Sequence, residues 1–371
     1  MSYPIRVLQV FHGMDCGGAE NMIMNLFRKM DRNKVCFDFL VHTDKHCFFD
    51  DEIERLDGKI YHVPYFNGLN YIPYKKALDA FFSTHRDYVA VHGDLGSCAN
   101  IYLRIAKEYG IYTIAHCHSS RPDKFSAKEL AYKYACIRTR NVADFFFTCS
   151  AIGGVYRYGR RIASSNRCKL LNNAIDVKKY IPDDAGRSKV RNEWGISKHQ
   201  KVVGNVARFV TEKNHAFLMN IFAEIAKRNN DAVLLLVGDG PLRSVIEEQA
   251  QSLHIESRVI FTGVRSDVPD LMAAMDVFVM PSLFEGLPVT MVEAQASGLK
   301  CFISDGVPND CILTDDVTKI ALAESSEYWA ERIMNSWDYT RTPNTETLKA
   351  KGFDVETTAQ WLTNFYLNCK G

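Results

Sequence analysis

Short apolar runs rich in β-branched residues alternate with amphipathic stretches along the first half of the chain. The apolar runs predict strands at residues 5–11, 36–42, 88–92, 112–117, 144–149 and 169–172. Between them, as at residues 19–30, 99–109 and 127–140, apolar side chains recur at the spacing of a helix. Strands that are apolar throughout and are separated by helices are typical of a parallel sheet covered on both faces.

A second series of the same kind begins near Lys201. It predicts strands at residues 201–207, 232–238, 258–262, 277–281 and 300–304, and helices at 214–228, 242–253 and 288–297. The polar segment 176–197 lies between the two series. We interpret it as the linker and the first helix of a second domain.

The two series together predict an α/β protein with two Rossmann-like domains. We place the first at residues 1–178 and the second at residues 179–352. The last stretch, 353–371, has a helical pattern at 355–366 that is a candidate to pack back on the first domain. Open parallel sheets bind ligands beyond the carboxyl ends of their strands, so we expect the two domains to face each other across a cleft that holds the site.

Composition narrows the class of protein. With 371 residues, 47% of them hydrophobic and 24% charged, the chain is long enough for two globular domains. The formal net charge of +1 does not favour nucleic acid as a partner. The 11 cysteines are odd in number and form no CxxC pair, which is typical of reduced thiols in a cytosol. The sequence has neither a signal-peptide pattern nor an apolar run of about 20 residues, so we expect a cytoplasmic protein.

One stretch is strongly basic. Residues 121–169 contain eleven Lys and Arg against three Asp and Glu, with aromatic side chains among them. Such a surface can bind anionic membrane or a lipid-linked acceptor, which would make the protein peripheral on the inner face of the plasma membrane. A solvated helix face explains the same charges, and the sequence leaves both interpretations open.

The segment 282–288, Ser-Leu-Phe-Glu-Gly-Leu-Pro, directly follows a predicted strand. Gly286 permits a tight turn, and Pro288 suits the first position of a helix. The free N–H groups of a helix start bind anions, while Glu285 and Glu293 can each hold hydroxyls of a sugar. The alternative is that Glu285 caps the helix and Glu293 is simply exposed.

This segment resembles the donor-site signature of the retaining family 4 glycosyltransferases, which have the two-domain GT-B fold, and in particular those of bacterial capsule and exopolysaccharide biosynthesis. The signature has two Glu residues with seven residues between them and Gly-Leu-Pro after the first. The matching residues are Glu285, Gly286, Leu287, Pro288 and Glu293. The resemblance implies that Glu285 contacts the transferred sugar and that Glu293 contacts the ribose.

Two cations follow the first predicted strand of the second domain. Arg208 ends that strand, and Lys213 lies near the start of the next helix. A rigid guanidinium and a mobile ammonium suit a diphosphate, and they can neutralise the charge that grows on a leaving nucleotide without a metal. The resemblance places both on the donor phosphates. A pair of surface cations at a loop is the simpler alternative.

Two motifs of the first domain also match. Gly17 and Gly18 follow the first strand, and the resemblance implies that they lie over the donor phosphates.

His116 and His118 end another strand. We see no third ligand at a clear spacing and expect no metal there. The resemblance implies that His118 points into the cleft beside the sugar, and we expect His116 to be a half-buried histidine with its hydrogen bonds satisfied.

Weaker matches lie at the ends of other strands. By the same resemblance, Ser150 and Asn173 lie at the edge of the cleft, and backbone near Val264 recognises the nucleotide base. Relatives usually carry a Glu after the Pro of the segment 306–308, whereas here an Asn and then Asp310 follow. We assign no role to Asp310.

The resemblance as a whole implies transfer of a sugar from a nucleotide-sugar donor, most often a UDP-sugar in this family, to a glycan or lipid-linked acceptor with retention of configuration. No residue is obviously placed as a covalent nucleophile, so we expect front-side attack without a cofactor. The catalytic candidates are His118, Glu285, Arg208 and Lys213. A nucleotide-sugar epimerase of the same fold and a non-catalytic nucleotide-sugar binding protein are the rivals. A glycogen-phosphorylase-like enzyme fits less well, because no segment places a Schiff-base Lys for pyridoxal phosphate.

Overall fold

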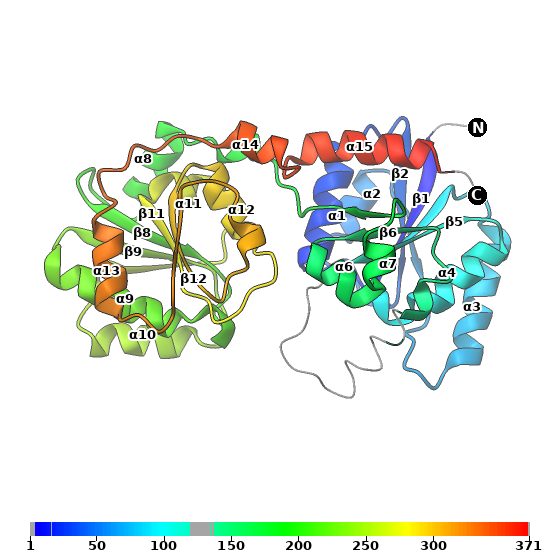
Figure 1. The fold of residues 1–371 in the computed structure, drawn as a ribbon, viewed down its shortest axis with the longest axis horizontal. Helices are drawn as coiled ribbons and strands as arrows, with labels where there is room; N and C mark the ends of the chain where they lie inside the picture. The colour runs from blue at the N-terminus through cyan, green and yellow to red at the C-terminus, as the bar shows by residue number, and fades with distance from the viewer. Residues whose placement is uncertain (1–3, 16, 119–133, 135–136, 370–371) are drawn as a thin grey trace. The chain divides into compact units, whose positions relative to one another are not determined.

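The computed structural model describes residues 4–15, 17–118, 134 and 137–369. The chain divides into two compact units (Figure 1): Met1–Ala174 together with Asp354–Gly371, and Ile175–Phe353. The first division lies four residues before the boundary expected from the sequence, and the second lies one residue after it. The C-terminal segment therefore belongs to the first unit.

The first unit is built on a seven-stranded parallel sheet with the order β3-β2-β1-β4-β5-β6-β7. The strands are β1 (Ile5–Phe11), β2 (Val35–Val41), β3 (Ile60–His62), β4 (Ala90–Gly93), β5 (Tyr112–Cys117), β6 (Phe145–Thr148) and β7 (Cys168–Leu170). The six strands predicted for this half of the chain are confirmed. The strand β3 was missed because it has three residues and none of them is fully buried.

Helices pack on both faces of this sheet. Among the described residues they are α1 (Gly18–Lys29), α2 (Asp50–Arg55), α3 (Tyr71–Thr84), α4 (Ala99–Glu108), α6 (Ala151–Tyr158), α7 (Arg160–Ala163) and α15 (Val355–Leu367). Along β1, Val7 and Phe11 join a core with α1 and α15, while Leu8 and Val10 join a core with α3 and α4. The helix predicted at residues 127–140 falls largely outside the described residues.

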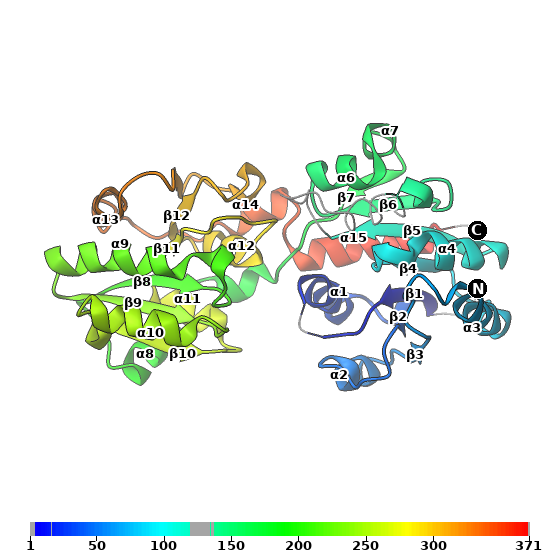
Figure 2. The same cartoon turned by 90° about the horizontal axis from the view of Figure 1, so that it is seen from below.

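The second unit has a six-stranded parallel sheet with the order β10-β9-β8-β11-β12-β13. Its strands are β8 (Lys201–Val206), β9 (Ala232–Val237), β10 (Val259–Gly263), β11 (Val277–Met280), β12 (Lys300–Ser304) and β13 (Val317–Ile320). Its helices are α8 (Asp184–Glu193), α9 (His215–Arg228), α10 (Arg243–Ser252), α11 (Val268–Ala274), α12 (Val289–Ala296), α13 (Ser326–Met334) and α14 (Thr345–Ala350). One core contains α9, α10 and α13 and the other contains α8, α11 and α12 (Figures 1 and 2).

Both units are thus parallel-sheet, Rossmann-like domains, and in each the strand order reverses beside the first strand. The reversal lies between β1 and β4 in the first unit and between β8 and β11 in the second. Ligands of open parallel sheets bind at such a reversal, beyond the carboxyl ends of the strands. The predicted residues follow these strands: Gly17 and Gly18 come after β1, Arg208 and Lys213 after β8, and Glu285 after β11.

None of the helices within the described ranges is long and apolar enough to cross a bilayer.

Three buried histidines are held in their neutral form. Burial lowers the pKa of His92 to about 3 and the pKa of His42 and His215 to about 4. His215 packs on Phe209, with the ring centres 4.3 Å apart. Neither ring nitrogen of His215 has a hydrogen-bond partner among the described residues. An apolar side chain can therefore replace this ring without breaking a hydrogen bond.

His215→Leu should make the fold more resistant to acid. The pKa of an unfolded histidine, about 6.5, lies above the value in the fold, so the unfolded state takes up the proton first and stability falls as the pH drops below about 6.5. Removing His215 removes its share of that loss, about 1–2 kcal/mol at pH 5. Urea unfolding at pH 7.5 and pH 5 measures the difference. A pH dependence equal to that of the wild type would contradict the prediction.

Candidate active site

The second unit brings Lys213 and Glu285 into direct contact. Lys213 ends the short 3-10 helix Thr211–Lys213 after β8, and Glu285 lies in the turn after β11. Lys213 Nζ donates to both carboxylate oxygens of Glu285, at 2.6 and 2.8 Å, and Ser282 Oγ donates to Oε1 at 2.7 Å. Glu285 is only 7% exposed. Its charge is therefore buried, paired and hydrogen-bonded, as a buried carboxylate requires.

Backbone contacts hold the turn 282–288 against its neighbours. Leu283 N donates to Glu212 O at 2.8 Å, and Glu285 N donates to Gly306 O at 3.2 Å. A Cβ at position 306 would lie 2.4 Å from Leu283 O, so only glycine allows this close approach. The loops after β8, β11 and β12 are therefore in contact with one another at the carboxyl edge of the sheet.

The helix α12 begins at Val289, with Pro288 as its N-cap residue, one residue later than predicted. The carboxylate of Glu285 is bound by Lys213 and Ser282 instead of by this helix, so the interpretation of Glu285 as a helix cap is wrong. Proline offers no capping oxygen, which leaves the first N–H groups of α12 suited to an external anion.

Glu293 lies on α12 and accepts a hydrogen bond of 2.6 Å from the hydroxyl of Tyr180. Burial raises the pKa of Glu293 above its usual value, and the hydrogen bond from Tyr180 offsets part of that rise. The interpretation of Glu293 as a simply exposed residue is therefore wrong. Tyr180 ends the 3-10 helix Val177–Tyr180 and was missed because it is 113 residues away and belongs to no motif.

Three further residues of this unit are exposed. The side chain of Arg208 has no hydrogen bond or ion pair to any residue within the described ranges. Val264 follows β10 and is 80% exposed. Asp310 is also exposed. The roles expected of Arg208 on a diphosphate and of the backbone near Val264 on a base stay predictions.

In the first unit the paired glycines open α1. Gly17 is the N-cap residue of α1, and Gly18 is its first residue. A Cβ on Gly17 would lie 2.1 Å from Glu20 Oε2, so glycine leaves room for that carboxylate. Burial raises the pKa of Glu20, and the nearby His118 is among the groups that lower it in part. Glu20 therefore lies in the electrostatic surroundings of His118, which the motif alone did not indicate.

His116 and His118 meet at one carboxylate oxygen. His118 Nε2 lies 2.7 Å from Asp94 Oδ1, and His116 Nδ1 lies 3.2 Å from the same atom. His116 is 2% exposed and its Nε2 has no hydrogen-bond partner among the described residues, so the expectation of a half-buried histidine with its hydrogen bonds satisfied is wrong. Burial holds the pKa of His116 well below the usual value. The side chain of His118 keeps 15% exposure. His118 is thus the more accessible of the two, with Asp94 as its direct partner.

His92 completes this cluster. Its Nε2 lies 3.1 Å from His116 Nδ1. The ligand-type atoms of His92, Asp94 and His116 all lie within 4.8 Å of one another. His92 and Asp94 are thus candidate ligands beside His116 that the sequence did not reveal, and the expectation of no metal there stays a prediction. It rested on spacing along one strand, whereas His92 and Asp94 come from the end of β4, the neighbouring strand in the sheet.

Ser150 and Asn173 have different surroundings. Ser150 Oγ accepts from Gly153 N at 3.0 Å and caps α6, so its hydroxyl is engaged within the first unit. Asn173 follows β7, and its Oδ1 is buried without a hydrogen-bond partner among the described residues. Contact of either residue with an acceptor stays a prediction.

Much of the basic stretch 121–169 lies outside the described residues, because residues 119–133, 135 and 136 are not among them. In the part that is described, Arg167 Nε donates to Asp144 O at 2.9 Å. Lys169 Nζ lies 3.6 Å from the ring centre of Trp361. These two cations contact other residues of the first unit, which favours a structural role for them over contact with a membrane or a lipid-linked acceptor.

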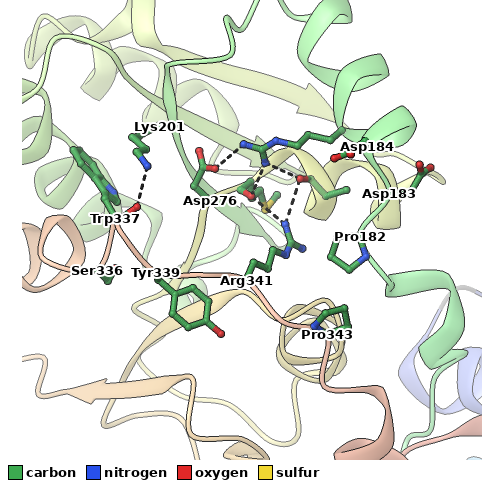
Figure 3. Close-up of a pocket in the computed structure, with 13 residues that line it drawn as sticks. Pro182, Asp183, Asp184, Lys201, Asp276, Ser336, Trp337, Tyr339, Arg341 and Pro343 are labelled. Carbon is green, nitrogen blue, oxygen red and sulfur yellow. Dashed lines mark hydrogen bonds and ion pairs between the residues drawn. The ribbon is translucent and has the colours of Figure 1, made fainter.

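Figure 3 shows a pocket of about 400 Å³ in the second unit. It is lined by Lys201, the first residue of β8, and so lies at the amino end of that strand, away from the predicted donor residues. Arg341 Nη1 donates to the backbone oxygens of Ala273 and Met275, at 3.3 and 3.2 Å. This guanidinium satisfies the C-terminal end of α11, so we assign the pocket a structural role.

The chain is similar to known glycosyltransferases. The family model described as Glycosyl transferases group 1 matches residues 186–337. A protein of Bacillus subtilis (strain 168) with the name Putative glycosyltransferase EpsF is 35% identical over 372 residues, covering 97% of this chain and 96% of its own length. An Escherichia coli protein named UDP-Gal:alpha-D-GlcNAc-diphosphoundecaprenol alpha-1,3-galactosyltransferase is 32% identical over 157 residues, which are 40% of each chain. The structure of HepE from Anabaena in complex with UDP matches with a TM-score of 0.80 at 19% identity, covering 97% of this chain and 99% of that one.

Glu293→Gln should stabilise the protein at neutral pH. Because the pKa of Glu293 is raised in the fold, ionising its carboxyl group costs the folded state more than the unfolded state. That cost is present at neutral pH and absent below the pKa of the unfolded carboxyl group, about 4.3. We expect a higher melting temperature at pH 7.5 and no gain at pH 4.

The exposed Glu248 provides the matched control for this substitution. Glu248→Gln should leave the melting temperature unchanged at both pH values. Equal melting temperatures of wild type and Glu293→Gln at both pH values would show that burial of Glu293 carries no cost.

Proposed function

This chain belongs to the group 1 glycosyltransferase family, and from that premise we propose that it moves a sugar from a UDP-sugar to a hydroxyl of a glycan or lipid-linked acceptor, with retention of configuration, in surface polysaccharide biosynthesis. The observation that carries the proposal is the contact of Lys213 with Glu285 at the carboxyl edge of the second sheet. An ammonium suited to phosphate lies there beside a carboxylate suited to a sugar hydroxyl, and this supports the proposal.

The diphosphate is proposed to bind between Lys213, Arg208 and the start of α12. These groups supply an ammonium, a guanidinium and backbone N–H donors, which together bind phosphate oxygens. Lys213 is already held by Glu285 before any ligand arrives, so it needs little reorganisation as negative charge grows on the leaving phosphate. Glu293 is proposed to bind the ribose, with Tyr180 holding its carboxylate in place.

Glu285 and His118 are each proposed to bind a hydroxyl of the transferred sugar. We propose front-side attack by the acceptor hydroxyl, whose proton passes to the leaving phosphate. None of these steps requires a metal or a cofactor, because the positive groups named above neutralise the departing charge.

An epimerase or a non-catalytic binding protein would use the same donor contacts. The relatives described above are named as transferases, so neither alternative is favoured. Incubation of UDP-glucose, UDP-galactose or UDP-N-acetylglucosamine without an acceptor separates the cases, because only an epimerase would form an isomerised sugar nucleotide.

Arg208→Ala should lower turnover on the order of 10²–10³-fold, the usual effect of removing one electrostatic donor. Arg208 is the most suitable residue for this substitution, because its side chain is exposed and its loss leaves no partner unpaired within the described ranges. Release of UDP from the UDP-sugar that the wild type uses gives the rate. Lys198, also exposed in the same unit, provides the control, and Lys198→Ala should keep the wild-type rate. Near-normal turnover of Arg208→Ala would contradict the phosphate assignment.

Chelation should leave the reaction intact. Lys213, Arg208 and the start of α12 supply the positive charge. We therefore expect the rate in about 5–10 mM EDTA to equal the rate in Mg²⁺. The rate of UDP release with and without chelator measures this. Strict dependence on Mg²⁺ or Mn²⁺ would contradict the proposed mechanism.

A further inference from the structure

A buried chain of polar side chains runs behind His118 in the first unit. Its members, in order, are His118, Asp94, His116, His92 and Tyr366. His118 Nε2 lies 2.7 Å from Asp94 Oδ1, which lies 3.2 Å from His116 Nδ1. His116 Nδ1 lies 3.1 Å from His92 Nε2, and His92 Nδ1 lies 2.6 Å from the hydroxyl of Tyr366. The chain therefore connects the ends of β5 and β4 with α15.

The carboxylate of Asp94 determines where the proton of His118 lies. An ionised carboxylate only accepts hydrogen bonds, so the ring nitrogen that hydrogen-bonds to it, His118 Nε2, carries the hydrogen. His92 Nε2 and His116 Nδ1 share one hydrogen bond, so one of these two nitrogens donates and the other accepts. Burial holds the pKa of His92 at about 3 and the pKa of His116 well below its usual value, so both rings are neutral near pH 7.

We propose that Asp94 is a positioning residue of the transferase, which holds His118 in the tautomer with its proton on Nε2 and leaves the lone pair of Nδ1 for a substrate hydroxyl. His118 Nδ1 is buried and has no hydrogen-bond partner within the described ranges. A buried acceptor without a donor is costly, and a sugar hydroxyl supplies a donor. The identity of that hydroxyl rests on the proposed function, whereas the tautomer does not.

A metal ion bound by His92, Asp94 and His116 is the competing interpretation of the cluster. Two ligands of a tetrahedral zinc ion, each about 2.0–2.1 Å from it, lie about 3.3 Å apart. The 2.7 Å between His118 Nε2 and Asp94 Oδ1 has the length of a charge-assisted N–H···O bond, and His118 is not a member of that triad. Within the triad, His116 Nδ1 lies 3.2 Å from Asp94 Oδ1 and 3.1 Å from His92 Nε2, which is near the separation of two zinc ligands, so binding of Zn²⁺ is one of the outcomes that the test separates.

The test is nitrogen NMR of the full chain labelled with ¹⁵N-histidine, with His118→Gln used to assign the signals of His118. In the wild type we expect one tautomer of His118, protonated on Nε2. An asparagine amide both donates and accepts, so Asp94→Asn should populate both tautomers. Protonation of His118 on Nδ1 in the wild type, or an unchanged Nε2 tautomer in Asp94→Asn, would overturn the proposal.

Asp38 provides the control, because it is a buried Asp of the same sheet whose carboxylate is bound by Arg6 and Tyr88. Asp38→Asn should lose stability and keep the wild-type tautomer of His118. If the tautomer of His118 also changes in Asp38→Asn, loss of stability alone would explain the change in Asp94→Asn. That result would overturn the proposal. Binding of one Zn²⁺ per chain that is lost in His92→Ala would also overturn it, by making Asp94 a metal ligand.

Turnover provides the second readout. With the UDP-sugar that the wild type uses, Asp94→Asn should lower kcat on the order of 10²-fold, in the range of a lost acid–base or orienting group, while the affinity for UDP changes less than about 2-fold. An unchanged kcat would contradict a positioning role. If the wild type turns over no UDP-sugar at all, the proposed function fails, and the NMR result still decides the role of Asp94.

Discussion

The ion pair between Lys213 and Glu285 is the contact on which the site of the second unit depends. It joins the loop after β8 to the turn after β11, across the point where the strand order reverses. Either charge buried alone would be costly, so the pair holds both loops in one arrangement. Ser282 and Gly306 add to this arrangement, one by a hydrogen bond to the carboxylate and the other by its close approach to the turn.

In the first unit, the pair of Asp94 and His118 joins two loops in a similar way. Asp94 after β4 and His118 after β5 meet beside the glycine loop that follows β1. Behind them, His92 hydrogen-bonds to His116 and to Tyr366 of the last helix. This explains in part why α15 belongs to the first unit, since it contributes a polar contact to the site as well as apolar side chains to the core.

The sequence predicted the fold well because parallel strands buried on both faces are apolar throughout and stand out from the helices between them. It missed β3, whose three residues are only partly buried. Glu285 and Glu293 were recognisable because their motif lies within one short segment and is read without the fold. Tyr180 and Asp94 were not, because each reaches its partner through the topology of the sheet or through a contact between distant segments.

The most direct test of the claim that the second unit binds a diphosphate is calorimetric titration of uridine, UMP and UDP into the full chain at one ionic strength. We predict that the affinity rises on the order of 10-fold or more from uridine to UDP, because Lys213, Arg208 and the start of α12 act on phosphate oxygens. Equal affinities for uridine and UDP would contradict the claim.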